Sequence, residues 1–81
     1  MFYIYILCSI KTRRYYVGSC KNIAVRFKQH NAGMVKSTKS LMPWSLIHQE
    51  SFITLSEARK REKQIKNWKK RSAIEHLLKH F

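Results

Sequence analysis

One carboxylate lies in the most basic part of this sequence. Residues 57–70 read EARKREKQIKNWKK, in a chain with 17 Lys and Arg but only 4 Asp and Glu. On a helix, Glu62 falls inside the apolar stripe formed by Leu55, Ala58, Ile65 and Trp68. Burying an ionised carboxylate is costly unless it is paired or binds a metal ion. Glu62 is therefore a candidate site residue, and the alternative is an ordinary surface pair with Lys66, one helical turn further on.

A second pair of functional side chains is spaced for one face of a helix. Arg26 and His30 are four residues apart, so they are neighbours on the helix predicted for residues 22–32. Asn22 suits the N-cap of this helix, and Gly33 suits the position after its end. The same side is expected to carry Ile23, Phe27 and Met34. Taken alone, Arg26 and His30 would more often form a solvated helix edge.

Three segments must form the sheet that positions these side chains. Aromatic and β-branched residues predict strands at 2–8 and 15–19, joined by a short polar loop into an antiparallel hairpin. The second strand is expected to end at Gly18. Residues 44–52 predict a third strand, with one face formed by Trp44, Leu46, His48 and Glu50.

Two capping patterns predict the remaining helices. TLSE at 54–57 and SAIE at 72–75 each place a hydroxyl residue three positions before a glutamate, the arrangement of a capping box. The helices are expected to begin after Thr54 and after Ser72. Together, the strands and helices indicate one α/β (α+β) domain over residues 1–81, with room for a single modest core.

The net charge of +13 indicates a polyanionic partner. Nucleic acid is the first candidate because basic side chains bind phosphates and release counterions. An anionic membrane surface or the ribosome is the second. The opening apolar run is too short to span a bilayer and lacks the basic start of a secretory signal. A cytoplasmic protein with two reduced thiols, Cys8 and Cys20, is the simplest expectation.

Four sequence blocks, in this order and spacing, resemble the GIY-YIG nuclease domain. They are YIY at 3–5, YVG at 16–18, RFKQH at 26–30 and EARKREKQIK at 57–66. Tyr3 stands where the family name has Gly, which is a common variation. The PW pair at 43–44 and the REKQIK segment are similar to the small, stand-alone branch of the family. The resemblance covers almost the whole chain and implies a three-stranded antiparallel sheet flanked by helices.

The resemblance also implies a metal-dependent phosphodiester cleavage site, with Tyr5, Tyr16, Arg26, His30 and Glu62 expected on one concave surface of the sheet. Glu62 would hold one Mg²⁺ or Mn²⁺ ion, since such ions bind one carboxylate together with waters and a substrate phosphate. Arg26 would contact the phosphate. Tyr5 would be the base that activates water, with Tyr16 and His30 positioning it. A free tyrosine has a pKa near ~10, so the metal, Arg26 and nearby lysines would have to lower the pKa of Tyr5.

The remaining candidates have plainer roles. Tyr3, Tyr15, Trp44 and Trp68 are expected in the core, and His76 and His80 on the surface. The overall charge makes a phosphate-contacting rim plausible for Lys36, Lys39, Lys69, Lys70 and Arg71.

Two function classes follow. The preferred one is a metal-dependent endonuclease acting on DNA, such as a branched or nicked repair intermediate, with RNA as the other substrate. The alternative is a non-catalytic nucleic-acid-binding module that uses only its charge. In either case a protein partner could supply targeting, because no second DNA-binding domain is evident.

The charge distribution generates a first prediction. The basic residues at positions 36, 39 and 69–71 should bind DNA without sequence preference, and the affinity should fall steeply as the salt concentration rises. Fluorescence anisotropy with a labelled oligonucleotide over a salt series would measure this. Weak binding that does not depend on salt would contradict the argument from charge.

Overall fold

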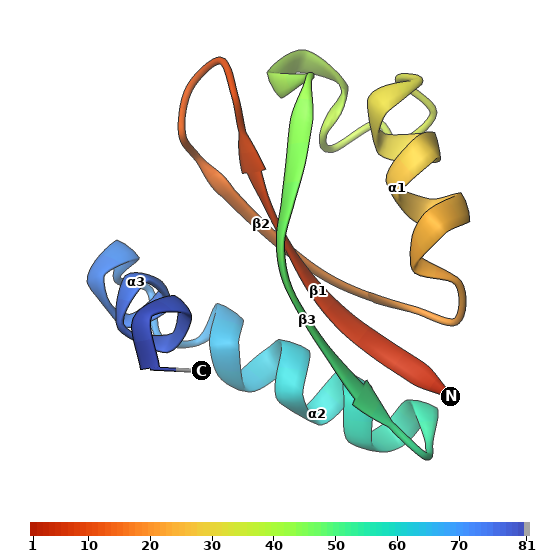
Figure 1. Cartoon of the computed structure of the whole chain (residues 1–81), viewed down its shortest axis with the longest axis vertical. Coiled ribbons are helices and arrows are strands. Elements are labelled where there is room, and N and C mark those ends of the chain that lie inside the picture. Colours follow the sequence, from red (N-terminus) through yellow and green to blue (C-terminus); the bar gives the residue numbers. More distant parts are fainter. Residues whose placement is uncertain (81) are drawn as a thin grey trace.

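A three-stranded antiparallel sheet organises the structure, a computed structural model in which residues 1–80 are described. The strands are β1 (Phe2–Ser9), β2 (Tyr15–Cys20) and β3 (Trp44–Phe52), and β1 lies between the other two. β2 is therefore an edge strand (Figure 1). The predicted α+β class and antiparallel sheet are confirmed, while Phe81, the last residue of the predicted domain, lies outside the described residues.

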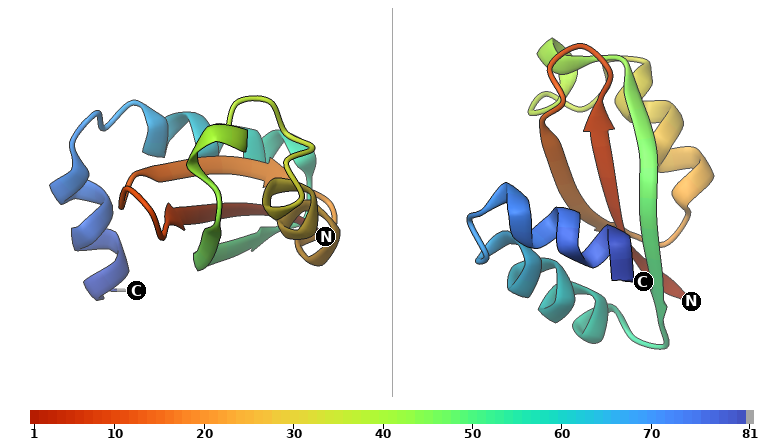
Figure 2. Two further views of the ribbon diagram at one scale, coloured as in Figure 1. Left: turned by 90° about the horizontal axis from the view of Figure 1, so that it is seen from above. Right: turned by 60° about the vertical axis from the view of Figure 1, so that its left-hand side comes forward.

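Helices cover both faces of the sheet (Figures 1 and 2). The helix α1 (Ile23–Asn31) and the short 3₁₀ helix η1 (Lys39–Leu41) lie on one side, which we call the α1 face. The helices α2 (Leu55–Lys66) and α3 (Arg71–His80) lie on the other, the α2 face. Within residues 1–80, none of these helices is long and apolar enough to cross a membrane.

Each face has its own small core. On the α2 face, the buried apolar side chains are Ile4, Ile6, Val17, Ala58 and Ile65. On the α1 face they are Tyr5, Leu7 and Trp44. The alternation along β1 separates the two sets, because successive side chains of a strand point to opposite faces. Trp44 is buried and Trp68 packs against the α2-face core, as predicted.

The third strand changes face at a bulge. Ile6 of β1 pairs with His48 and Leu7 pairs with Leu46, so Ile47 is an extra residue in β3. Trp44 and Leu46 therefore pack on the α1 face, whereas His48 and Glu50 face α2. The prediction that all four alternating residues share one face is wrong for this reason.

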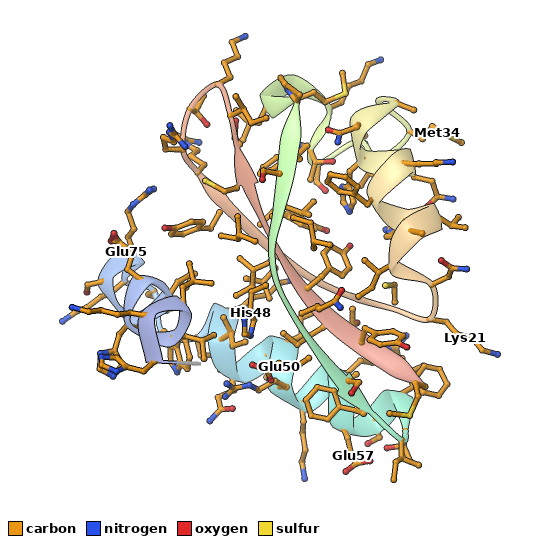
Figure 3. All side chains as sticks on the ribbon, in the orientation of Figure 1. Lys21, Met34, His48, Glu50, Glu57 and Glu75 are labelled. Atoms are coloured by element: carbon orange, nitrogen blue, oxygen red, sulfur yellow. The ribbon has the colours of Figure 1, made fainter. Side chains whose placement is uncertain are left out.

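The predicted caps at Asn22 and Thr54 are confirmed. The Asn22 side chain accepts a hydrogen bond from the N–H of Val25, and Gly33 adopts φ 75° just after the C-cap of α1. Thr54 and Glu57 form the predicted capping box of α2. By contrast, Met34 lies beyond the end of α1 and is 72% exposed, projecting away from the sheet (Figure 3).

Two predicted boundaries are wrong. α3 begins at Arg71, so Ser72 lies in its first turn and not before it. β2 continues to Cys20 and does not end at Gly18. Gly18 is instead an interior strand residue.

A partly buried ion-pair network joins α2 to β3. Arg61 of α2 donates two hydrogen bonds to Glu50, at 2.9 and 3.2 Å. The Nε2 of His48 lies 2.8 Å from the second oxygen of the same carboxylate (Figure 3). Burial raises the pKa of Glu50, but the hydrogen bonds from Arg61 and His48 outweigh burial and leave that pKa below its ordinary value. Glu50 is therefore ionised in the folded protein at neutral pH.

This network generates a prediction about stability. Glu50→Gln should lower the free energy of unfolding at pH 7 by roughly 2 kcal/mol, since it removes the negative charge and one of the two oxygens that accept from Arg61 and His48. Because folding lowers the pKa of Glu50, its stabilisation is present above its ordinary pKa of 4.5 and is lost as the pH falls below that value. Urea unfolding of both proteins from pH 7 to pH 3 should therefore converge at the acid end.

The matched control is Glu75→Gln on α3. Its partner Arg71 lies 3.8 Å away in a largely exposed i,i+4 pair, and such pairs add little to stability. An equal effect of the two substitutions would contradict a special role for Glu50.

Candidate active site

A buried chain of polar side chains links β1 to α1. The Tyr5 hydroxyl lies 2.9 Å from Nε2 of His30, and the Nδ1 of His30 lies 2.7 Å from the hydroxyl of Thr38. Thr38 in turn donates to the carbonyl oxygen of Val35 at 3.3 Å. Tyr5 is 2% exposed, and His30 and Thr38 are fully buried.

We assign the tautomer of His30 from the Thr38 hydroxyl. When Thr38 donates its only proton to Val35, it accepts a hydrogen bond from Nδ1 of His30. In this tautomer Nε2 of His30 is the acceptor, and the Tyr5 hydroxyl donates to it.

Arg26 and Tyr16 complete a cluster on the α1 face. The Tyr16 ring centroid lies 6.4 Å from that of Tyr5 and 5.1 Å from that of His30. Arg26 forms a hydrogen bond with Tyr5 that raises the pKa of the guanidinium, and it also donates to Gln29 at 3.1 Å. The structure therefore brings together four of the five predicted catalytic residues: Tyr5, Tyr16, Arg26 and His30.

The pKa of Tyr5 is the reverse of what a general base needs. Burial raises the pKa of Tyr5 to about 12, although the hydrogen bond from Arg26 acts in the opposite direction. Burial and the charge of Arg26 lower the pKa of His30, so its ring is neutral at neutral pH. The expectation that nearby positive charge lowers the pKa of Tyr5 is wrong for the protein alone, because desolvation of the buried phenol is the larger effect.

Gly18 creates the space for the Tyr5 ring. A Cβ atom added at Gly18 would lie 2.6 Å from Cζ of Tyr5, closer than non-bonded carbon atoms approach. Gly18 is the register partner of Tyr5 on β2. A side chain at position 18 would therefore occupy the position of the phenol.

Glu62 lies on the other side of β2. It projects from α2, and its two oxygens accept hydrogen bonds of 2.6 Å from Ser19 and 2.6 Å from Lys66. Ser19 is the register partner of Ile4, whose side chain belongs to the α2-face core. Burial raises the pKa of Glu62, but the hydrogen bonds from Lys66 and Ser19 outweigh burial and leave the pKa lowered, so the carboxylate is charged.

The five predicted residues therefore do not share one face. The expectation that Glu62 lies on the same concave surface as Arg26 is wrong, because α2 and α1 pack on opposite faces of the sheet. Lys66 bridges the two groups around the edge of β2, since its Nζ contacts Glu62 and lies 5.9 Å from the ring centroid of Tyr16. The residues flank one open strand edge.

The predicted basic rim is divided in the same way. Lys36 and Lys39 belong to the segment after α1, which packs on the α1 face through Leu41. Lys69 and Lys70 lie in the turn between α2 and α3, Arg71 begins α3, and all three line a cavity beside β2. The structure thus shows two basic patches.

The family model of the GIY-YIG catalytic domain matches residues 1–75. The chain belongs to the GIY-YIG family. This is a nuclease family, and the match covers every predicted site residue from Tyr5 to Arg71.

Relatives of similar length support the assignment to a stand-alone GIY-YIG branch. The chain is 48% identical to a UPF0213 protein of Syntrophus aciditrophicus over 79% of this chain and 75% of that one. It is 37% identical to a UPF0213 protein of Staphylococcus haemolyticus over 89% and 88% of the two chains. The solution NMR structure of a UPF0213 protein from Bacillus halodurans aligns with a TM-score of 0.61 at 30% identity, covering 98% of this chain and 84% of that one.

The described residues fit a hard divalent cation only if one protein carboxylate binds it together with waters and substrate oxygens. Among residues 1–80, no group of three or more His, Cys, Asp or Glu side chains could hold a metal ion. A single ionised carboxylate, Glu62, does suit Mg²⁺ or Mn²⁺, which keep several waters and take further oxygens from a substrate phosphate. Lys66 would have to release one oxygen, and its side chain is 48% exposed, so it has room to move.

Sequence reasoning named Lys66 as a partner of Glu62 from its i,i+4 spacing but missed two other residues that position this GIY-YIG site, Ser19 and Thr38. Ser19 and Lys66 orient Glu62, and the Thr38 hydroxyl lies 2.7 Å from Nδ1 of His30. Ser19 and Thr38 carry no comparable signal, because their contacts span 43 and 8 residues of sequence.

The close approach at Gly18 generates a prediction. Gly18→Ala should displace the Tyr5 ring, lower stability by roughly 1–3 kcal/mol as an overpacking substitution, and reduce nuclease activity strongly. Thermal unfolding and cleavage assays would measure the two effects. Ala32→Gly on the exposed end of α1 is the control for backbone changes near the site. Wild-type activity of Gly18→Ala would contradict a role for Tyr5.

Proposed function

We propose that this protein is a divalent-metal-dependent endonuclease that hydrolyses phosphodiester bonds in DNA. The observation that carries the proposal is the pair of groups on either side of β2. An ionised carboxylate lies on one side, and a guanidinium with two tyrosines lies on the other. Family membership supports the reaction class. A structured repair or recombination intermediate is the substrate we favour by analogy, and RNA is the other substrate to be tested.

Glu62 is the residue proposed to hold Mg²⁺ or Mn²⁺. When bound, such an ion would polarise the scissile phosphate and offset charge on the leaving oxygen. The hydrogen bond from Ser19 fixes the orientation of the carboxylate, so the second oxygen is available once Lys66 moves away. The lowered pKa of Glu62 favours this role, because a carboxylate must be deprotonated to bind a metal ion.

Arg26 and Tyr16 are the groups proposed to touch the substrate on the α1 face. Arg26 carries a fixed charge that would stabilise the phosphate as negative charge develops in the transition state. Tyr16 is half-buried at the strand edge, whereas Tyr5 and His30 are enclosed. We therefore assign the orientation of attacking water to Tyr16. Tyr5 and His30 become positioning residues that hold Arg26 and Tyr16 in place.

A non-catalytic nucleic-acid-binding module is the second candidate. Two observations favour it: Lys66 occupies an oxygen of Glu62, and the pKa of Tyr5 is about 12. Both functions require the basic surface, so binding alone does not distinguish them. Cleavage by variants of Glu62 does.

Glu62→Gln is the decisive substitution. It keeps the size and the hydrogen bond from Ser19 but removes the charge that would hold the cation. We expect cleavage of labelled DNA in Mg²⁺ or Mn²⁺ to fall by at least about a hundredfold, while DNA affinity stays the same or rises slightly. The folded state should persist with a small loss of stability, because glutamine keeps one acceptor oxygen for Ser19 and the Lys66 side chain of the lost ion pair is 48% exposed. A panel of single-stranded, duplex, flap and branched DNAs, together with a matching RNA, should be tested.

Glu57→Gln on the same helix is the matched control. It makes the same charge change, and glutamine can still complete the capping box with Thr54. Wild-type cleavage by Glu62→Gln would remove the metal assignment. Equal Mn²⁺ binding by the wild type and Glu62→Gln, measured by electron paramagnetic resonance with DNA present, would remove it as well.

A further inference from the structure

A cavity of about 440 Å³ lies beside the proposed site and shares Tyr16 with it. It is formed by β2, the end of α2 and the beginning of α3. Its rim is strongly cationic, with five basic residues: Arg14, Lys66, Lys69, Lys70 and Arg71. Among residues 1–80, no acidic side chain lines it. We refer to it as the β2–α3 cleft.

The floor of the β2–α3 cleft is apolar. Val17, Ile65 and Ile74 line it together with the rings of Tyr15 and Tyr16. An apolar floor beneath a cationic rim matches a ligand with a flat apolar part and a phosphate, which is the chemistry of a nucleotide. The volume lies within the range of about 300–1,000 Å³ that is usual for small-ligand pockets.

Two residues connect the cleft to the proposed site. Lys66 and Tyr16 both line the cleft. Lys66 also donates to Glu62 at 2.6 Å, and Tyr16 belongs to the cluster with Tyr5 and His30. A nucleotide in the cleft would therefore be the direct neighbour of a phosphate at the edge of β2.

The walls of the cleft are held by specific contacts. The Arg71 guanidinium lies 4.4 Å from the centroid of the Tyr15 ring and also donates to the carbonyl of Arg13, which fixes the beginning of α3 against β2. Lys69 adopts φ 55°, a backbone conformation that is unfavourable for most residues other than glycine. A lysine at this position adds charge to the rim at some cost in backbone strain.

We propose that the β2–α3 cleft binds an unpaired nucleotide of the substrate strand next to the cleaved bond. The inference rests on the proposed function and adds the substrate class, which is DNA with a single-stranded segment at the cut. A paired base in a duplex has both faces stacked, so it cannot present a face to the floor of the cleft. An unpaired base can do so while its phosphate contacts the rim.

Binding without cleavage tests the proposal. The protein carries Glu62→Gln, with a chelator present, and fluorescence anisotropy measures its affinity for three DNAs of equal length: single-stranded, tailed duplex and blunt duplex. We expect the single-stranded and tailed DNAs to bind about tenfold more tightly than the blunt duplex. An abasic site at one position of the tail should weaken binding by about tenfold, since one stacked base is lost.

The double substitution Lys69→Gly and Lys70→Ala tests whether the β2–α3 cleft is where the single strand binds. Glycine suits φ 55°, so the turn should fold normally, which thermal unfolding would verify. For the single strand, the slope of log affinity against log salt should decrease by about 1.4, or about 0.7 for each phosphate contact. Lys60→Ala with Lys79→Ala is the control, since it removes the same charge from exposed positions outside the cleft.

Equal binding of blunt and tailed DNA, or equal effects of the two double substitutions, would overturn the proposal. Neither result depends on cleavage, so a failure here is distinct from a failure of the proposed nuclease activity. Glu62→Gln can lose cleavage even if the cleft shows no preference for unpaired DNA. Conversely, the cleft can show that preference even if Glu62→Gln still cleaves.

Discussion

The Tyr5 hydroxyl lies at the point where the central strand, the edge strand and the first helix meet. Its ring lies against Gly18 of β2, and its proton is directed to His30 of α1. His30 then holds Thr38, whose carbonyl accepts a hydrogen bond from the Trp44 indole at 3.0 Å. The chain of contacts thus runs from β2 through α1 to the beginning of β3. It does so on the face with the smaller set of buried apolar residues, where hydrogen bonds must supply what apolar burial does not.

On the α2 face, ion pairs and hydrogen bonds hold α2 against the sheet in a protein with a net charge of +13. Arg61 and Glu50 join α2 to β3, and Glu62 joins α2 to β2 through Ser19. Each carboxylate is partly buried and accepts hydrogen bonds from more than one donor, so the cost of desolvation is offset. With only 4 acidic residues in the chain, placing two of them here concentrates negative charge where α2 contacts the sheet.

The order of the elements and the identity of the family could be predicted from the sequence, because both depend on local patterns. Periodicity indicates strands and helices, and the Thr54–Glu57 capping box marks the beginning of α2. The face of each residue depends on longer-range information. A single extra residue, Ile47, turns His48 and Glu50 from one face to the other, and no local pattern signals that bulge. The position of Glu62 relative to Arg26 likewise depends on which face each helix covers.

The pKa of Tyr5 shows why residue types alone did not assign the chemistry. The role implied for Tyr5 by the family resemblance requires the metal, Arg26 and nearby lysines to lower its pKa. The structure adds the burial of the phenol, which is the larger effect, and the acceptor on His30, which takes up its proton. A buried, protonated tyrosine is a poor base, but it can hold neighbouring side chains in position. Because Tyr16 is the tyrosine at the open strand edge, between His30 and Lys66, a nucleic acid approaching β2 would meet Tyr16 before it met Tyr5.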